Sequence, residues 1–288
     1  MSEAQPVDIA VIGLGVIGGS VALRLRERGT EIRAFTTSTS DASEAERAGI
    51  SVAKSLDEAV RDVGLVLIAV PLDRVCAVAE QVIGGAPGPA TILHAASLQR
   101  AEALRVMPES AARVLGTHPM AGSHRTGFGG ARPDLFRDAT VYIEARASAR
   151  QREDAELFWS LAGARRIEYL SSAAHDDAMS WVSHLPQLAS TALASTYEQK
   201  ARGGPNESAV RQLGPGGRDA TRLAMSALEM WRPILEGAPP ETVAALATFE
   251  AGVRRLRTAL EVRDWATVDA MWESASRWRN GIERGGGE

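Results

Sequence analysis

The chain has 288 residues, of which 45% are hydrophobic, enough to build the cores of two domains. Its 32 basic and 36 acidic residues give a net charge of -4, which excludes the global positive field that attracts nucleic acid or an anionic membrane. The polar residues 1–6 lack the cationic and apolar segments of a secretion signal, and no apolar run reaches membrane length. We therefore expect a cytoplasmic protein that binds neither nucleic acid nor a membrane.

A glycine-rich turn follows the first apolar run, at the point where a strand should turn into a helix. The glycines of its G-x-G-x-x-G pattern are Gly13, Gly15 and Gly18. The first can adopt the tight turn, the second has no Cβ to keep the backbone away from a diphosphate, and the third lets the helix pack closely. The helix predicted over residues 18–27 then offers free N–H groups at its start, which favour an anion, and Val16 and Ile17 of the turn are expected to contact the cofactor with the glycines. Three glycines can also form an ordinary tight turn, but the order strand, glycines, helix and second strand favours a dinucleotide.

The first half of the chain alternates strand and helix signals. The predicted strands are residues 8–12, 31–35, 65–70, 91–94, 113–117 and 140–144. This alternation predicts an α/β fold, a Rossmann-type doubly wound parallel sheet. From about Ser171 onward only helices are indicated, such as residues 241–260, with loops at 202–205 and 214–217. We therefore predict a dinucleotide-binding domain over residues 1–170 and an all-helical domain over 171–288.

Cofactor choice is expected to depend on the end of the second strand, where an NAD-dependent domain usually presents an acid to the ribose 2′-hydroxyl. Thr36, Thr37 and Ser38 occupy this place instead. Without a carboxylate a 2′-phosphate is not repelled, and hydroxyls can donate to it, so NADP is favoured over NAD. The same run can also be a simple polar loop, and no Arg follows it directly. Val70 and Pro71, which end the third apolar run, should line the dinucleotide at the carboxyl edge of the sheet.

Two histidines lie in candidate substrate-binding positions. His118 follows a predicted strand and can accept a proton from a substrate hydroxyl near neutral pH, or only hydrogen-bond the neighbouring loop. His184 and Gln187 share one polar face of an otherwise apolar helix with Asp177 and Ser180, and this face can line a site or a hydrated helix interface. The 5 histidines show no spacing typical of a metal site, so we expect no bound metal.

Together these motifs resemble the prephenate/arogenate dehydrogenase family of tyrosine biosynthesis over nearly the whole chain. The most specific segments are the glycine-rich start, His-Pro-Met-Ala-Gly at 118–122, His-Asp at 175–176, Ser-His-Leu-Pro at 183–186, Arg-Asp-Ala-Thr-Arg at 218–222 and Met-Trp at 230–231. The resemblance implies NAD(P)-dependent oxidative decarboxylation of a small cyclohexadienyl carboxylate. The reaction would convert prephenate to 4-hydroxyphenylpyruvate, or arogenate to tyrosine, in a homodimer formed through the helical substrate and dimerisation domain.

The resemblance also implies roles for individual residues. His118 would be the catalytic histidine that hydrogen-bonds the ring hydroxyl, and Ser97 would support that hydroxyl or the nicotinamide. Arg222 would hold a substrate carboxylate, and Trp231 would lie near the site. Ser123, in the loop after the His118 motif, would face the substrate.

Several positions depart from the family pattern. An acid and a lysine are often found where this chain has His94 and Gln99, a second helix histidine is replaced by Gln187, and His124 replaces an acid. Because these changes surround the expected substrate, an amino-substituted prephenate or another cyclohexadienol is an alternative. A 3-hydroxyacid or imine reductase, and a non-enzymatic dinucleotide sensor, are the other classes that the residues leave open.

Overall fold

The computed structural model describes residues 9–85, 91–100, 104, 113–123, 125–202 and 212–285. The chain divides into two compact units, Met1–Pro239 and Pro240–Glu288. In chain order, the first unit contains β1 (Ile9–Ile12), α1 (Val16–Glu27), β2 (Ile32–Phe35), α2 (Thr39–Arg47), α3 (Leu56–Val60), β3 (Leu65–Ile68), η1 (Leu72–Arg74), α4 (Val75–Gly85), β4 (Thr91–His94), β5 (Val114–Pro119), η2 (Phe128–Gly130), β6 (Thr140–Glu144), α7 (Ala149–Ala162), β7 (Arg166–Leu170), α8 (Ser172–Met179), η3 (Ser180–His184), α9 (Leu185–Ala201), α11 (Pro215–Thr221), η4 (Arg222–Met225) and α12 (Leu228–Glu236). The second unit contains α13 (Pro240–Glu261) and α14 (Trp265–Gly285).

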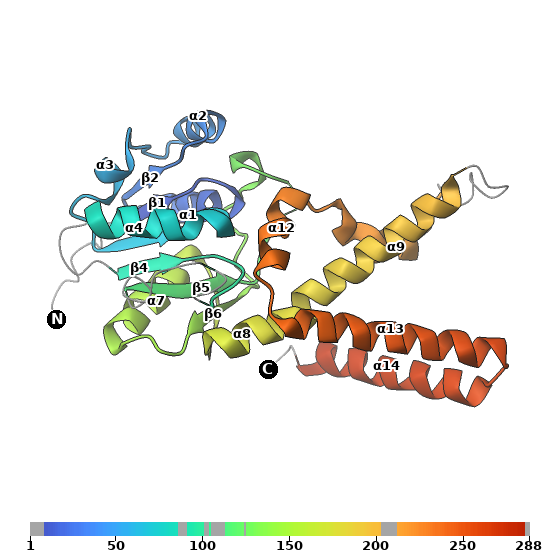
Figure 1. Ribbon diagram of the computed structural model, residues 1–288. Coiled ribbons are helices and arrows are strands. Elements are labelled where there is room, and N and C mark those ends of the chain that lie inside the picture. Colours follow the sequence, from blue (N-terminus) through green and yellow to red (C-terminus); the bar gives the residue numbers. More distant parts are fainter. Residues whose placement is uncertain are drawn as a thin grey trace. The chain divides into compact units, whose positions relative to one another are not determined.

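The strands of the first unit form one sheet in the order β2-β1-β3-β4-β5-β6-β7 (Figure 1). β1 to β5 run parallel, as the predicted Rossmann-type sheet requires. β6 differs from the prediction because it runs antiparallel to β5, and β7 is parallel to β6. The described connection from β5 to β6 contains only the short turn η2 and no crossover helix. The chain therefore re-enters the sheet at the edge where β5 ended, which makes the pair antiparallel.

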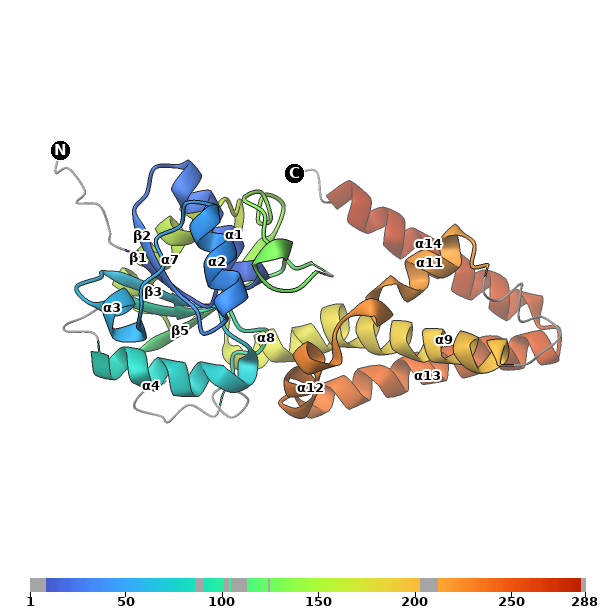
Figure 2. The same cartoon turned by 90° about the horizontal axis from the view of Figure 1, so that it is seen from above.

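Helices cover both faces of the sheet, and Figure 2 shows α1 and α4 on opposite sides of the strands. Successive side chains of a strand point to opposite faces. Val11 accordingly packs in one core with Trp159 of α7, while the next residue, Ile12, packs in a second core with Val82 of α4. All four side chains are buried. The continuous apolar runs of the sequence therefore mark strands that are covered on both sides.

Two elements differ from the sequence-based expectations. β7 was not predicted, because its residues lie at the edge of the sheet with alternating exposed and half-buried side chains, which weakens the apolar signal. The prediction of a loop at 214–217 is wrong for residues 215–217, which form the first turn of α11. Pro215 is compatible with this position because the first turn of a helix needs no N–H donor from it. The other predicted loop lies, at residues 203–205, outside the described residues.

α8, η3 and α9 follow one another as a continuous helical segment (Figure 1). Residues Ser180–His184 form a π-helical turn within it, and such turns are frequent at functional sites. The buried polar side chains of the segment are His175, Asp176, Ser180, His184, Gln187 and Ser190. Buried polar groups need hydrogen-bond partners, so this segment is a source of site residues.

The second unit is a pair of helices, α13 and α14, that contact each other. Its exposed large apolar side chains are Val243, Leu246, Phe249, Val253, Leu260, Val262, Trp265, Trp272, Trp278 and Ile282. Exposed apolar surface of this extent is typical of a protein interface. No helix in the described part of the chain is long and apolar enough to cross a membrane.

Candidate active site

The glycine-rich turn has the geometry that a dinucleotide diphosphate requires. Gly13 has a φ of 95° and donates its N–H to the Phe35 carbonyl oxygen at 2.8 Å. A Cβ on Gly18 would lie 1.9 Å from the Gly13 carbonyl oxygen, so only glycine allows this close approach. A Cβ on Gly15 would meet no atom within 4 Å, so its backbone faces open space. The start of α1 at Val16 is thus accessible to an anion, and the residues fit the predicted cofactor.

The end of β2 carries hydroxyls and no carboxylate before Asp41. Thr36 Oγ1 accepts the Ser38 N–H at 3.2 Å, and Ser38 Oγ caps α2 by accepting the Asp41 N–H at 3.3 Å. Thr37 between them is exposed. The hydroxyls of Thr36 and Ser38 therefore shape the local turn, while Thr37 remains open to a ligand.

The end of β3 lies beside the glycine turn. A Cβ on Gly13 would approach Val70 Cγ1 to 3.0 Å, whereas Pro71 is exposed. The strand itself ends at Ile68, two residues before the predicted end. The structure therefore places Val70 next to the glycine turn, and the contact of Val70 and Pro71 with a dinucleotide stays a prediction.

The segment after β5 returns across the starts of α1 and α2. Asp41 Oδ1 accepts the Phe128 N–H at 2.8 Å. A Cβ on Gly130 would lie 3.0 Å from both Arg125 Cβ and Val16 Cγ2, so Arg125 begins beside the first turn of α1. Its exposed side chain forms no ion pair or hydrogen bond with any residue that the structure describes. Sequence reasoning missed this cation because it is remote from the glycine turn along the chain.

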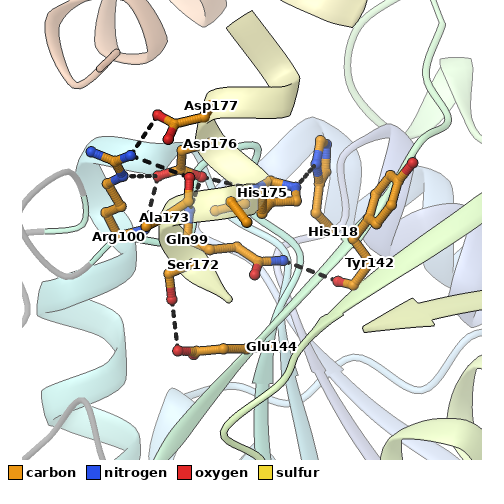
Figure 3. A network of polar contacts seen from close by, with 12 residues as sticks. Gln99, Arg100, His118, Tyr142, Glu144, Ser172, Ala173, His175, Asp176 and Asp177 are labelled. Atoms are coloured by element: carbon orange, nitrogen blue, oxygen red, sulfur yellow. Dashed lines mark hydrogen bonds and ion pairs between the residues drawn. The ribbon is translucent and has the colours of Figure 1, made fainter. Parts of the chain in front are cut away.

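A chain of polar contacts begins at His118, which lies in β5 (Figure 3). Its Nδ1 is 3.0 Å from His175 Nε2, and His175 Nδ1 is 2.8 Å from Asp176 Oδ1. His175 and Asp176 are fully buried, and the rings of His118 and His175 meet edge to face. A carboxylate can only accept, so the proton of His175 lies on Nδ1, which donates to Asp176. His175 Nε2 is then an acceptor, so the proton of His118 lies on its Nδ1, which donates to His175. This leaves His118 Nε2 with a free lone pair.

Asp176 also holds the loop that follows β4 and contains Ser97. The Gln99 N–H donates to its Oδ1 at 2.8 Å, and the Arg100 N–H donates to its Oδ2 at 3.0 Å. Arg100 Nη2 lies 2.6 Å from Asp177 Oδ1 (Figure 3). One buried carboxylate thereby orients both the histidine pair and the loop of Ser97. Sequence reasoning quoted the His-Asp pair as a motif but assigned it no role.

Three histidines of the site are held neutral near pH 7. Burial, followed by the neighbouring His175, lowers the pKa of His118 to about 3. Burial likewise lowers the pKa of His94 to about 4, and it lowers the pKa of His184. A neutral imidazole keeps the lone pair that a proton acceptor needs, so His118 is in the state that proton abstraction requires.

The low pKa of His94 predicts an acid-sensitive fold. His94 is buried, and its Nδ1 accepts the Ala96 N–H at 3.3 Å. In the unfolded chain the imidazole takes up a proton below about pH 6.5, whereas in the folded chain it does so only near pH 4. The free energy of unfolding therefore keeps the contribution of neutral His94 above pH 6.5. It falls by about 3 kcal/mol as the pH is lowered towards 4.

The substitution His94→Asn should reduce this acid-induced loss, because an amide oxygen can accept the same N–H without titrating. Urea unfolding between pH 7.5 and 4.5 measures it. Equal dependence of the unfolding free energy on pH in the wild type and the variant would contradict the prediction.

A second cluster joins η3, α9, η4 and α12. The rings of His184 and Trp231 lie edge to face, with centroids 6.1 Å apart. Gln187 Nε2 donates to the Leu223 carbonyl oxygen at 2.9 Å, which places it next to Arg222. Gln187 Oε1 and Trp231 Nε1 are buried, and neither has a hydrogen-bond partner in the described part of the chain. Such orphaned polar atoms are costly, and a bound ligand can satisfy them.

The remaining predicted site residues are less constrained. Arg222 is exposed, and its side chain forms no hydrogen bond or ion pair with any described residue. Ser97 is half-buried, and Ser123 Oγ accepts the Arg125 N–H at 3.0 Å. His124 lies outside the described residues. Within the part of the chain that the structure describes, no group of histidine, cysteine and acidic side chains could hold a metal ion.

Comparison with known proteins identifies the family. Residues 21–168 match the nucleotide-binding domain of prephenate dehydrogenase, and residues 171–273 match its dimerization domain. The chain belongs to the prephenate dehydrogenase family. The resemblance predicted from the motifs is thus confirmed, and so is the predicted fold class of a Rossmann-type domain followed by helices.

Relatives and solved structures agree with this membership. The cyclohexadienyl dehydrogenase of Zymomonas mobilis is 28% identical over 270 residues, which cover 89% of this chain and 89% of that protein. The prephenate dehydrogenase of Bacillus subtilis is 27% identical over 285 residues, covering 95% of this chain and 76% of that protein. The structure of A. aeolicus prephenate dehydrogenase with hydroxyphenyl propionate and NAD+ superposes with a TM-score of 0.84 at 22% identity, covering 98% of this chain and 100% of that one. Synechocystis arogenate dehydrogenase gives a TM-score of 0.77 at 23% identity, covering 96% and 99%. These structures share the fold of this prephenate dehydrogenase family member.

Proposed function

We propose that this chain oxidises and decarboxylates prephenate or arogenate with NAD(P), using His118 as the proton acceptor. The observation that carries the proposal is the His118–His175–Asp176 contact chain at the end of β5 in a member of the prephenate dehydrogenase family. The turn of Gly13, Gly15 and Gly18 would hold NAD(P), which would supply the acceptor for the hydride of the ring carbon that bears the hydroxyl. His118 Nε2 accepts the hydroxyl proton as this carbon becomes a carbonyl carbon. The bond to the ring carboxylate then breaks with loss of CO2, and its electron pair moves through the ring to the carbonyl oxygen and completes the aromatic ring. That oxygen takes the proton back from His118 to give the phenol.

The contact chain explains how His118 can act as a base despite its low pKa. The proton that arrives at Nε2 creates a positive charge, and the His118 Nδ1–H donates to His175 Nε2. His175 in turn donates to Asp176, whose carboxylate stabilises the positive charge along the chain. A positioned acid–base group of this kind accelerates a reaction by roughly 10²- to 10⁴-fold.

A spectrophotometric screen at about 340 nm, the wavelength at which reduced nicotinamide absorbs, tests the function. Purified full-length protein is assayed with prephenate, arogenate and an amino-substituted prephenate, each with NAD and NADP, and CO2 release is measured in parallel. The expected result is reduction of the dinucleotide with equimolar CO2. Reduction without CO2 would indicate a reductase of another substrate class, and binding without turnover would indicate a dinucleotide sensor.

NADP is the cofactor that we favour. Thr37 is exposed at the end of β2, and no acid lies between this end and Asp41. Arg125 begins beside the first turn of α1 without an ionic partner in the described chain. No Lys or Arg occurs in residues 13–22 or 35–46, so a cation for the 2′-phosphate of NADP has to come from another segment. Arg125 can supply it, because a guanidinium donates two parallel hydrogen bonds to a phosphate.

Arg125→Gln should weaken NADP binding more than NAD binding. The loss of a hydrogen bond to a charged group, about 1.5–3 kcal/mol, corresponds to roughly a 10- to 150-fold increase in the dissociation constant for NADP. Calorimetric titration of both dinucleotides measures the difference, with Arg47→Gln, an exposed arginine on α2, as the control. Tighter binding of NAD than NADP by the wild type would reverse the cofactor assignment.

We propose that Arg222, the first residue of η4, pairs with a carboxylate of the substrate. A lysine at this position keeps the charge but loses the paired N–H donors, so Arg222→Lys should raise KM with a loss of about 1–3 kcal/mol. Steady-state kinetics and thermal unfolding, measured on the same variant, check this prediction. Unchanged kinetics with a lowered Tm would instead make Arg222 a structural residue of its helix.

The other predicted assignments are kept as part of the proposal. His184, Gln187 and Trp231 would contact the substrate, supported by the orphaned atoms of the last two, and Ser97 and Ser123 belong to the loops around His118. The exposed apolar side chains of the second unit support a homodimer formed through the helical part of the chain. A domain boundary near residue 170 and a cytoplasmic location complete the proposal.

A further inference from the structure

A concavity lies in the first unit, and none of its lining residues belongs to the site described above. It has a volume of about 210 Å³ and lies between the last turns of α1, the last turn of α7 and the segment 133–137. The arginines that line it are Arg24, Arg28, Arg137 and Arg165. Its wall also includes the Ser160 hydroxyl, so the lining offers hydrogen-bond donors and is mostly polar.

The positive charge of this cavity is not balanced within the described protein. The one lining carboxylate, Asp134, lies 3.7 Å from the Nε of Arg132, which is not part of the lining. Arg28, Arg137 and Arg165 form no side-chain hydrogen bond or ion pair with any described residue. Three like charges in one small concavity repel one another, and an anion between them would relieve that repulsion.

Arg24 adds a buried donor that has no partner among the residues that the structure describes. Its Nη1 lies 3.3 Å from Glu27 Oε2, but its buried Nε makes no hydrogen bond with any of them. Gly163, which has a φ of 103°, packs close to this Nε, because a Cβ on it would lie 3.5 Å away. Buried donors are nearly always satisfied in folded proteins, so an oxygen atom from a ligand is expected near this wall.

We propose that this arginine cavity binds a small multivalent oxyanion, a metabolite that carries a phosphoryl group or two or more carboxylates. Guanidinium groups pair with either chemistry through parallel N–H donors. The volume is of the size that a small metabolite fills.

The arginines could instead serve only the ends of the helices. Arg24 lies in the last turn of α1, and a cation there interacts favourably with the helix dipole. In that case their removal lowers the stability of the protein and changes no ligand response. The two roles are therefore separable by experiment.

The test measures anion-induced stabilisation of the full chain, saturated with dinucleotide so that the glycine turn is occupied. Thermal unfolding is recorded against inorganic phosphate and against citrate, with chloride holding the ionic strength constant. The double variant Arg28→Gln/Arg165→Gln removes two lining arginines. Arg26→Gln/Arg166→Gln removes the same charge from exposed positions close by in the sequence that do not line the cavity.

The expected result is a saturable rise of Tm in the wild type and in the control, and a loss of at least tenfold in apparent affinity in the cavity variant. Preference for phosphate or for citrate identifies the oxyanion class. An equal ligand-induced shift in both double variants, or no saturable shift in the wild type with either anion, would overturn the proposal. If the cavity variant is unstable, calorimetric titration of the single variants Arg165→Gln and Arg166→Gln makes the same comparison.

Discussion

His118→Asn should lower kcat by about 10²- to 10⁴-fold and leave the dissociation constant of the dinucleotide nearly unchanged. The asparagine can preserve the contact to His175 Nε2, now 3.0 Å from His118 Nδ1, but it has no lone-pair nitrogen to accept the substrate proton. The dinucleotide is held elsewhere, at the turn that Gly13 begins. Steady-state kinetics and calorimetric titration of NADP check both parts of the prediction.

Circular dichroism of His118→Asn serves as the folding control. A variant that is folded, binds NADP and turns over at the wild-type rate would remove His118 from the chemistry. A variant that loses both turnover and dinucleotide binding would instead indicate a disturbed fold at the carboxyl edge of the sheet.

Asp176→Asn should lower both stability and kcat. The carboxylate accepts three donors, the N–H groups of Gln99 and Arg100 and the His175 Nδ1–H. An amide offers one oxygen and one NH2 group, so at least one of the three buried N–H donors would face the NH2 group instead of an acceptor. We expect a loss of about 3 kcal/mol in the free energy of unfolding, the cost of an unsatisfied buried group beside a lost charged hydrogen bond.

The same substitution should change the tautomer of His175. If the amide NH2 faces His175 Nδ1, the ring proton moves to Nε2 and no longer leaves an acceptor for the His118 Nδ1–H, as in the known effect of such a change on a catalytic triad. We expect kcat to fall by about 10²- to 10⁴-fold. The pH profile of kcat/KM should change its acid limb, a readout that a merely structural carboxylate would not affect.

Asp177→Asn is the matched control for this experiment. Asp177 is the adjacent carboxylate on α8, is half exposed, and pairs with Arg100 at 2.6 Å without contacting His175. The substitution Asp177→Asn should lower the free energy of unfolding by at most about 1 kcal/mol, which is the usual contribution of an exposed ion pair. It should leave the pH profile of kcat/KM unchanged. If both variants shift the profile equally, Asp176 has no special link to the histidine pair.

The sequence by itself determined the elements whose signals are local. The order of apolar run, glycines and helix located β1, the turn at Gly13 and α1, because strand patterning and positive φ depend on neighbouring residues. It also located the parallel strands and His118. β7 escaped because an edge strand with exposed side chains has little apolar signal, and the antiparallel direction of β6 depends on a connection that local patterns do not encode.

The tertiary structure alone decided which polar groups meet. His118 and His175 come from a strand and a helix that are far apart in the sequence, and their hydrogen bond exists only because the fold brings the first half of α8 to the end of β5. Likewise Arg125 lies beside Val16 because the segment after β5 is tied to α2 through Asp41. Periodicity reports which face of its own element a residue occupies, whereas long-range contacts depend on how elements pack, so these partners could be found only in the folded chain.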